Sequence, residues 1–209
     1  MSARISSIDL GDLTEFFQTR PDVARTAARI AVNDTTRRTA LPTFRKGINE
    51  QVNFPNGYVN KDRLSATKLA TDTDLTAKIT ARFRPTSLAR FAPGQSFDGA
   101  RRTGGVRVKV NRGGGATRLP GAFFVKLRRG GDSQDGFNVG LAIRLKPGQK
   151  LRGRKKGGAS VQLAPNVYLL YGPSVDQVFR DVMVEKSDDI AADLVTQFTR
   201  QWVRLSASR

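Results

Sequence analysis

The side chains that could do chemistry in this sequence are mostly Lys and Arg, and they gather in one stretch. Residues 101–156 hold sixteen Lys or Arg against two acidic residues, Asp132 and Asp135. This stretch therefore carries fourteen of the eighteen net positive charges of the 209-residue chain. A charge excess this local indicates a polyanion or an acidic protein surface as partner, and it says little about fold.

The densest basic run is expected to bind phosphates or an acidic neighbour. It comprises Lys150, Arg152, Arg154, Lys155 and Lys156, and Arg128 and Arg129 precede it along the chain. The surrounding residues 146–158 are rich in glycine and cannot bury apolar area, which predicts a mobile loop or arm. Each phosphate that such a loop neutralises releases counterions, and without interleaved aromatic residues the contact would be independent of sequence. DNA phosphates and an acidic neighbouring protein stay equal alternatives.

Catalytic chemistry is restricted because the chain contains no histidine and no cysteine. Ser-His-Asp triads, Cys-His pairs, thiolate nucleophiles and metals held by His or Cys are therefore excluded. An enzyme would have to work with carboxylates, Lys, Ser or Tyr alone. The sequence predicts a protein that is not an enzyme and that uses no cofactor or metal.

Strings that superficially resemble ligand sites have simpler explanations. The glycines at 113–115 run into residues that cannot start the helix a phosphate-binding loop requires. Asp132 and Asp135 lack the other ligands of a calcium loop and predict a hairpin turn. A carboxylate cluster near the C-terminus could mimic a metal-dependent nuclease site. We expect its residues to lie mostly on outer helix faces and at an N-cap at Ser187, which favours a solvated surface. The cluster is Asp176, Asp181, Glu185, Asp188, Asp189 and Asp193.

Hydrophobic periodicity predicts helices at both ends of the chain. After a lead over residues 1–19, apolar residues recur at helical spacing over 21–53, as in one kinked helix or two abutting ones. The opposite face is rich in Arg and Lys, which favours a solvated surface and leaves a nucleic-acid stripe as the alternative. Residues 174–207 predict two helices, the second starting at Ser187.

Between the helices the apolar period changes to that of β-strands. A short helical piece is expected over 61–70, followed by alternating apolar and polar residues over 74–171. One of these strands, starting at Ala122, is expected to place Phe123 or Phe124 in the core.

The predicted fold class is α+β, as a single domain over residues 1–209. A long N-terminal helix and C-terminal helices would pack on a mainly antiparallel β-sheet with a long basic Gly-rich loop. The longest apolar run, Val167 to Tyr171, is too short to span a bilayer, and the N-terminus has no apolar segment of signal-peptide length. No membrane association is predicted, and the lack of cysteine fits either a reducing compartment or an exposed particle.

Four short strings occur in an order that carries a resemblance. They are VRVKVNRG from Val106, LPGAF over Leu119, Pro120, Gly121, Ala122 and Phe123, LRRG from Leu127, and YLLYGPSV from Tyr168. From about residue 20 onward the chain resembles the minor tail protein Z family, the tail completion proteins of lambda-like long-tailed phages. It departs from the family in the Asp-containing loop at 130–136 and in a longer acidic start to the last helix.

The resemblance implies a structural virion protein at the phage neck, assembled in the host cytoplasm. Its partners would be further copies in a hexameric ring, the tail terminator protein, the head–tail connector or head completion protein, and the genomic DNA end. The basic residues around 128–129 and 150–156 would contact DNA or acidic partners, and residues 119–123 would fix a sheet corner at an interface. Charge alone supports an alternative, a sequence-independent nucleic-acid-binding protein.

Overall fold

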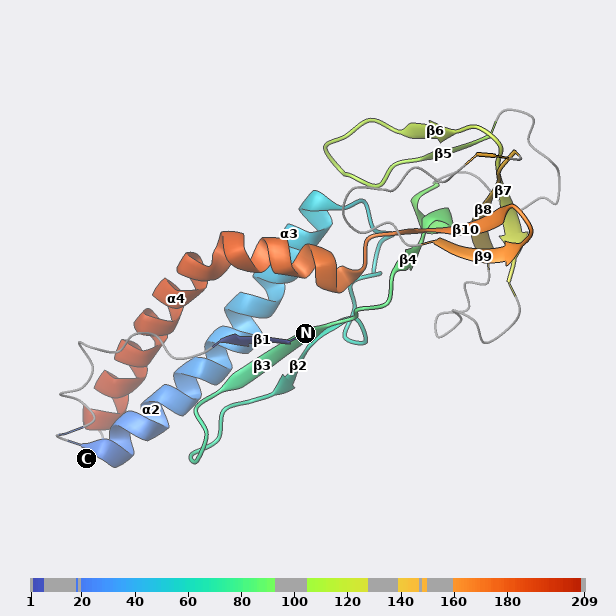
Figure 1. Cartoon of the computed structure of the whole chain (residues 1–209). Helices are drawn as coiled ribbons and strands as arrows, with labels where there is room; N and C mark the ends of the chain where they lie inside the picture. The colour runs from blue at the N-terminus through green and yellow to red at the C-terminus, as the bar shows by residue number, and fades with distance from the viewer. Residues whose placement is uncertain are drawn as a thin grey trace. The chain divides into compact units, whose positions relative to one another are not determined.

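The computed structural model describes residues 2–5, 18, 20–92, 105–127, 139–146, 148–149 and 160–207 (Figure 1). The fold is α+β, as predicted, and every strand pairing among these residues is antiparallel. The chain divides into two compact units. Unit one comprises Met1–Ile48, Val59–Arg82 and Phe179–Arg209, and unit two comprises Asn49–Tyr58 and Phe83–Val178.

The first helical run has three consecutive parts, α2 (Pro21–Asp34), the π-helical turn η2 (Thr35–Ala40) and α3 (Leu41–Gln51). Helix was predicted over 21–53, as one kinked helix or two abutting ones, and the structure has continuous helical segments from Pro21 to Gln51. The backbone N–H of Leu41 donates to the carbonyl of Thr36, five residues earlier. Pro42 follows and has no N–H with which to continue an α-helical ladder, so the irregularity falls beside it.

The second helical run is a single helix, α4 (Val175–Ala207). The prediction of two helices with an N-cap at Ser187 is wrong, because the Oγ of Ser187 donates to the carbonyl of Val184 (3.1 Å) inside the helix. The true cap is Ser174. Its Oγ accepts from the N–H of Gln177 (3.1 Å), and the Oε1 of Gln177 accepts from the N–H of Ser174 (2.9 Å). This reciprocal pair is a capping box.

The core of unit one lies between α2, α3 and α4. Ala27, Ala28 and Ala31 of α2 form a buried cluster with Leu194 and Phe198 of α4. Small side chains on α2 let the backbones approach, so the large residues of α4 fill the space between them.

Farther along the same helices, Phe44 of α3 and Phe179 of α4 meet edge to face, with ring centroids 5.0 Å apart. Gly47 of α3 lies so close to Val182 that a Cβ there would be 2.6 Å from its Cγ1. Both contacts lie within unit one and join α3 to α4.

Unit one also holds a three-stranded sheet of order β1-β3-β2, made of β1 (Ser2–Ile5), β2 (Leu64–Lys68) and β3 (Ala77–Ala81). The prediction of a helical piece over 61–70 is wrong, because β2 occupies it. Strand β2 pairs antiparallel with β3, and this partner fixes an extended backbone that local periodicity did not show. Strand β1 forms within the segment that was expected to be only a lead.

Unit two is built on a five-stranded sheet. Its strands are β4 (Thr86–Ser87), β10 (Val167–Gly172), β8 (Val139–Arg144) and β7 (Ala122–Lys126), in that order, with β9 (Ser160–Ala164) also paired to β10. The 3-10 turn η3 (Leu88–Phe91) adds Leu88 and Phe91 to the core, both fully buried. Phe123 and Phe124 are only half-buried, so the prediction that one of them fills the core is wrong; Ala122 is the buried residue of β7.

A separate two-stranded ribbon in unit two pairs β5 (Val106–Val108) with β6 (Thr117–Leu119). The single domain predicted over 1–209 stays a prediction, since the division into units does not place them relative to one another. Within the described ranges, none of the helices has the length and apolar character needed to cross a bilayer.

Candidate functional site

Seven residues predicted to contact DNA or acidic partners fall outside the described part of the chain. They are Arg128, Arg129, Lys150, Arg152, Arg154, Lys155 and Lys156. The first two follow the end of β7, and the other five lie in the sequence between β8 and β9. Their contacts therefore stay predictions.

The string from Leu119 to Phe123 lies where the chain passes from one sheet to another. Leu119 ends β6 of the ribbon, and Ala122 and Phe123 begin β7 of the five-stranded sheet. Gly121 in the connecting turn has a φ of +73°, a left-handed conformation that favours glycine. The proposed role of these residues at a subunit interface stays a prediction.

The ribbon presents one apolar and one basic face. Val106 and Val108 point inward and are buried at 0% and 4% exposure, whereas Arg107 between them is exposed. In the antiparallel register Arg107 stands directly opposite Arg118 of β6, which is also exposed. Their Cβ atoms should be about 5 Å apart.

More basic side chains continue this surface along the chain. Lys109 is half-buried and follows Arg107 by two residues, so strand periodicity puts both on the same side. Arg112 is exposed just beyond, and its guanidinium donates to the carbonyl of Asn49 (3.1 Å). We call Arg107, Lys109, Arg112 and Arg118 together the basic ribbon surface.

Backbone hydrogen bonds fix the ribbon to the body of unit two. The N–H of Lys109 donates to the carbonyl of Phe91 (2.7 Å), and the N–H of Asn53 donates to the carbonyl of Val110 (2.7 Å). The side-chain amide of Asn53 also donates to the carbonyl of Lys109 (3.2 Å). These hydrogen bonds hold the ribbon to unit two at the residues that follow β5. The side chains of Arg107 and Arg118 stay exposed.

Glycines shape both ends of the ribbon. Gly105, before β5, has a φ of +76°, and a Cβ there would collide with the carbonyl of Leu119 on the paired strand. The glycines at 113–115 lead into strand β6 and not into a helix, in agreement with the rejection of a phosphate-binding loop. Glycine here serves the close approach and reversal of two strands.

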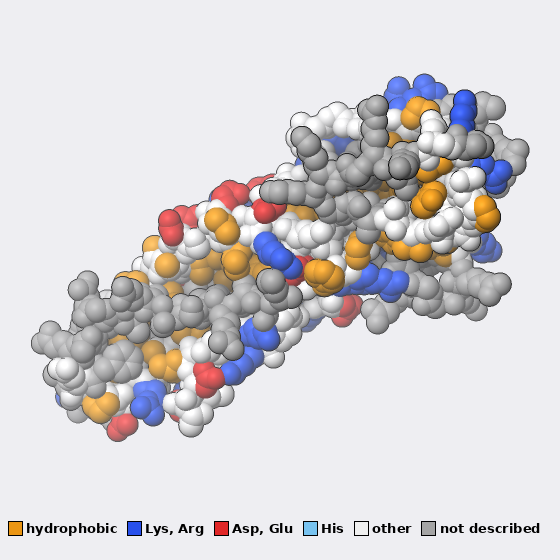
Figure 2. Space-filling model, in the orientation of Figure 1, with side chains coloured by type: hydrophobic (Ala, Val, Ile, Leu, Met, Phe, Trp, Pro, Cys, Tyr) orange, Lys and Arg blue, Asp and Glu red, His pale blue; other side chains and the backbone are white. Residues whose placement is uncertain are grey.

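Charge in the described part of unit two is strongly unbalanced. Its acidic residues are Glu50 and Asp176, and Asp176 is buried. Its basic residues are Arg84, Arg90, Arg107, Lys109, Arg112, Arg118, Lys126, Arg144 and Lys146. Figure 2 shows blue side chains over the part of the surface that Figure 1 labels β6. The described residues around the basic ribbon surface therefore carry a net positive charge.

The carboxylates of the C-terminal cluster follow α4. Asp181, Glu185, Asp188 and Asp189 are exposed, as expected, and Figure 2 shows red side chains along this helix. Asp193 instead turns inward and accepts a hydrogen bond from Thr35 Oγ1 (2.9 Å). Among the residues that the structure describes, no group of acidic side chains is arranged to hold a metal ion.

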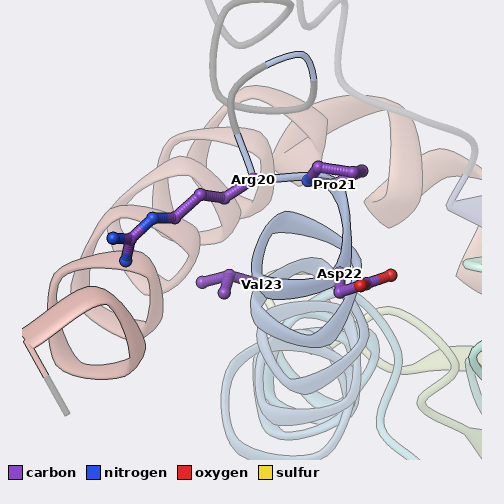
Figure 3. Close-up of a pocket in the computed structure, with 4 residues that line it drawn as sticks. All are labelled: Arg20, Pro21, Asp22 and Val23. Atoms are coloured by element: carbon purple, nitrogen blue, oxygen red, sulfur yellow. The ribbon is translucent and has the colours of Figure 1, made fainter. Parts of the chain in front are cut away.

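A hollow of about 250 Å³ lies at the start of α2, lined by Arg20, Pro21, Asp22 and Val23. Figure 3 shows Arg20 extending toward α4 while Asp22 points away from it. One guanidinium nitrogen of Arg20 donates to the carbonyl of Ser206 (3.4 Å). Because the side chains of Arg20 and Asp22 point in different directions, these two charged groups of the lining are not placed to bind the same ligand.

The clearest perturbed carboxyl belongs to the turn between β2 and β3. A hydrogen bond from the Lys68 side chain, together with hydrogen bonds from Thr76, holds the pKa of Asp74 at about 2. The N–H of Thr76 donates to the Asp74 carboxylate (2.9 Å), and the N–H of Asp74 donates to Thr71 Oγ1 (3.1 Å). These are bonds of a stabilised turn, and the group stays ionised at neutral pH.

Sequence reasoning found β5 but missed its partner. The alternation from Val106 to Val110 predicted a strand, whereas β6 has only three residues, Thr117–Leu119, and ends at Pro120. The reversal over the glycines at 113–115 was the available signal, because a glycine-rich turn after a strand often joins two antiparallel strands. Without β6, the opposition of Arg107 and Arg118 could not be seen.

No protein-family model, no curated protein and no solved structure matches this chain.

Proposed function

We propose that this protein is a structural component of the neck of a long-tailed phage, where it completes the tail and joins it to the head connector. The observation that carries the proposal is the order of the short strings that resemble the tail completion family. Two of them coincide with turning points of the fold. LPGAF spans the passage from β6 to β7, and YLLYGPSV spans the end of β10 and the capping box of α4.

The proposed assembly is a homo-oligomeric, hexameric ring around the DNA channel, with the tail terminator and the head connector or head completion protein on either side. Rings close through head-to-tail contacts between two different surfaces of each copy. The exposed carboxylates of α4 and the basic stretch 101–156 offer such a pair of opposite charge. In this role the protein positions other molecules and carries out no reaction, and it requires no cofactor.

Neutralising the densest basic run tests the proposal. Changing Lys150, Arg152, Arg154, Lys155 and Lys156 to Gln should leave the protein folded, because the only apolar side chains in residues 146–158 are those of Pro147 and Leu151. The yield of infectious particles should fall at least about tenfold, since several charge-assisted contacts are lost together. Circular dichroism checks the fold, and plaque titre with co-sedimentation checks incorporation into tails.

A matched control removes five exposed basic residues from unit one: Arg25, Arg37, Lys46, Lys61 and Arg200. This variant has the same net charge and should retain most of the yield. Normal yield from the first variant would refute the role of the basic run. A wild-type protein that never co-sediments with tails, as ring or monomer, would refute the neck assignment itself.

The alternative, a sequence-independent nucleic-acid-binding protein, is favoured by one observation, the excess of basic over acidic residues in unit two. It predicts tight binding of free nucleic acid by the monomer and no association with particles. Size-exclusion chromatography with and without tails separates the two functions.

A further inference from the structure

We propose that strand β9 is a docking edge for an extended segment of an acidic partner protein, which adds to the five-stranded sheet as a further strand. The segment that fits this edge alternates apolar and acidic side chains. The inference goes beyond the neck assignment and does not rest on it, because it names a binding edge and a partner chemistry and requires neither a ring nor a tail.

The first argument is that β9 is an open edge. Within the described ranges it pairs with β10 alone, and Figure 1 shows the two strands as the arms of one hairpin. Strand β8 pairs with the same residues of β10, 167–170, and so takes its other side. All five residues of β9 are exposed. The outer side of an edge strand presents backbone N–H and C=O groups with which an added strand can pair.

The second argument is that this edge lacks the charges that usually protect one. Exposed edge strands often carry Lys or another charged residue, which discourages pairing with a further chain. Strand β9 has no charged residue, and its Val161 and Leu163 are exposed at 51% and 47%. Its register with β10 shifts between Gln162 and Ala164, next to the turn. Regular pairing remains over 160–162, and we place the contact there.

The third argument is that an apolar row of the sheet continues to this edge. Val161 stands opposite Leu169 of β10, and Leu169 stands opposite Ala142 of β8. Residues directly opposite one another share a face of the sheet. Leu169 and Ala142 are buried, whereas Val161, at the end of the row, is half exposed. A strand added beside β9 would cover Val161 with its own side chain, which favours an apolar residue at that position of the partner.

The fourth argument is that the hairpin is fixed before binding. Asn166 in its turn has a φ of +59°, a left-handed conformation that Asn adopts more readily than most residues. The carbonyl of Asn166 accepts from the N–H of Leu145, just after β8 (2.8 Å). The turn is therefore tied to the neighbouring strand, and little affinity is lost to ordering β9 when a partner binds.

Net charge favours an acidic partner. The described part of unit two has the nine basic residues named above against Glu50 and the buried Asp176. Lys155 and Lys156 also precede Ser160 closely in the sequence, so the covalent chain keeps them within roughly 18 Å of it. An acidic segment is attracted to this charge, whereas a second copy of the same unit is repelled by it.

The test is the binding of fluorescent peptides to the purified full chain, measured by anisotropy. The probe is a peptide of alternating Val and Glu. One comparison peptide alternates Val with Lys, and another alternates Gly with Glu, so each removes one of the two proposed features. The Val/Glu probe should bind at least about tenfold more tightly than either. A Val/Glu peptide with N-methyl groups on two adjacent central residues should lose about as much, because both of its edges lose a backbone donor.

A variant of β9 and a matched control locate the contact. Val161→Gln leaves the net charge unchanged, so attraction between net charges alone predicts unchanged binding. The proposal predicts an affinity about fivefold lower, because the apolar contact at the edge is lost. Val203→Gln makes the same change at an exposed valine of α4 in unit one and should bind within about twofold of the wild type. Circular dichroism confirms that both variants are folded.

Several results would overturn the inference. They are equal binding of the probe and either comparison peptide, undiminished binding of the N-methylated peptide, unchanged affinity of Val161→Gln, and an equal loss in Val203→Gln. A wild-type dimer that Val161→Gln dissociates, seen by size-exclusion chromatography, would assign the edge to a second copy and overturn it too. Failure of the neck assignment looks different: the wild type would not associate with tails, while its peptide binding would persist.

Discussion

At the scale of single residues, a close contact between a glycine and a valine in unit one has a testable consequence. Gly47 in α3 lies against Val182 in α4, where an added Cβ would be 2.6 Å from a methyl group. Glycine inside a helix normally costs about 1 kcal/mol relative to alanine. At position 47 an alanine would gain that helix propensity, but its methyl group would clash with Val182. The clash should cost more than the propensity gains, because packed interiors do not yield to an inserted methyl group.

We therefore expect Gly47→Ala to destabilise the protein by about 1–2 kcal/mol, despite the better helix propensity of alanine. Combined with Val182→Ala, which makes room for the new methyl group, it should show a favourable coupling of at least about 1 kcal/mol. Urea unfolding of the four proteins of the cycle measures this. Gly113→Ala is the control, since a Cβ there meets nothing within 4 Å. A stabilised Gly47→Ala protein would show that the helices are not packed this closely.

At the scale of elements, α4 illustrates which boundaries a sequence reveals. Ser174 and Ser187 both have acidic or amide residues in the turn that follows them, Asp176 and Gln177 after the first and Asp188 and Asp189 after the second. Only their surroundings distinguish them. Ser174 follows Pro173, two residues after the end of β10, whereas the hydroxyl of Ser187 donates to the carbonyl of Val184 inside a continuous helix. The hydroxyl of a Ser inside a helix can donate to a backbone carbonyl of the preceding turn. Such a residue cannot be told from an N-cap Ser by its sequence alone.

Replacing each serine with alanine separates the two roles. Ser174→Ala should cost about 1 kcal/mol, because the N–H of Gln177 loses its acceptor in a buried position. Ser187→Ala should be neutral or slightly stabilising, since alanine is the better helix former. Thermal melting measures both changes. A larger loss from Ser187→Ala would indicate a helix that restarts there.

Local pattern predicted the other elements unequally. The run from Pro21 to Gln51 and the strands β3, β5, β7 and β8 were found because their apolar period is clear over several residues. Strands β1, β2 and β6 were missed, because pairing with other segments defines them and their own sequences show no clear apolar period. The pairing of Arg107 with Arg118 was missed for the same reason, because it depends on the position of β6.

At the scale of the whole molecule, the two units share continuous helices. The division falls after Ile48, inside α3, and after Val178, inside α4. Melting one unit alone would cut both helices and expose new unsatisfied ends. This connectivity favours the single domain that composition predicted.

Differential scanning calorimetry should therefore show one unfolding transition, with equal calorimetric and van't Hoff enthalpies. The Ser174→Ala variant should shift that transition as a whole by a few degrees. Two resolved transitions, or a shift confined to one part of the endotherm, would contradict a single domain.

The interleaving of unit one has a consequence for synthesis on the ribosome. Helix α2 is translated well before the Leu194 and Phe198 of α4 that cover Ala27 and Ala31. Unit two, whose final segment ends at Val178, is complete before that point. The nascent polypeptide must therefore keep the alanine-lined face of α2 uncovered until the end of α4 has been synthesised, and only then can this core form.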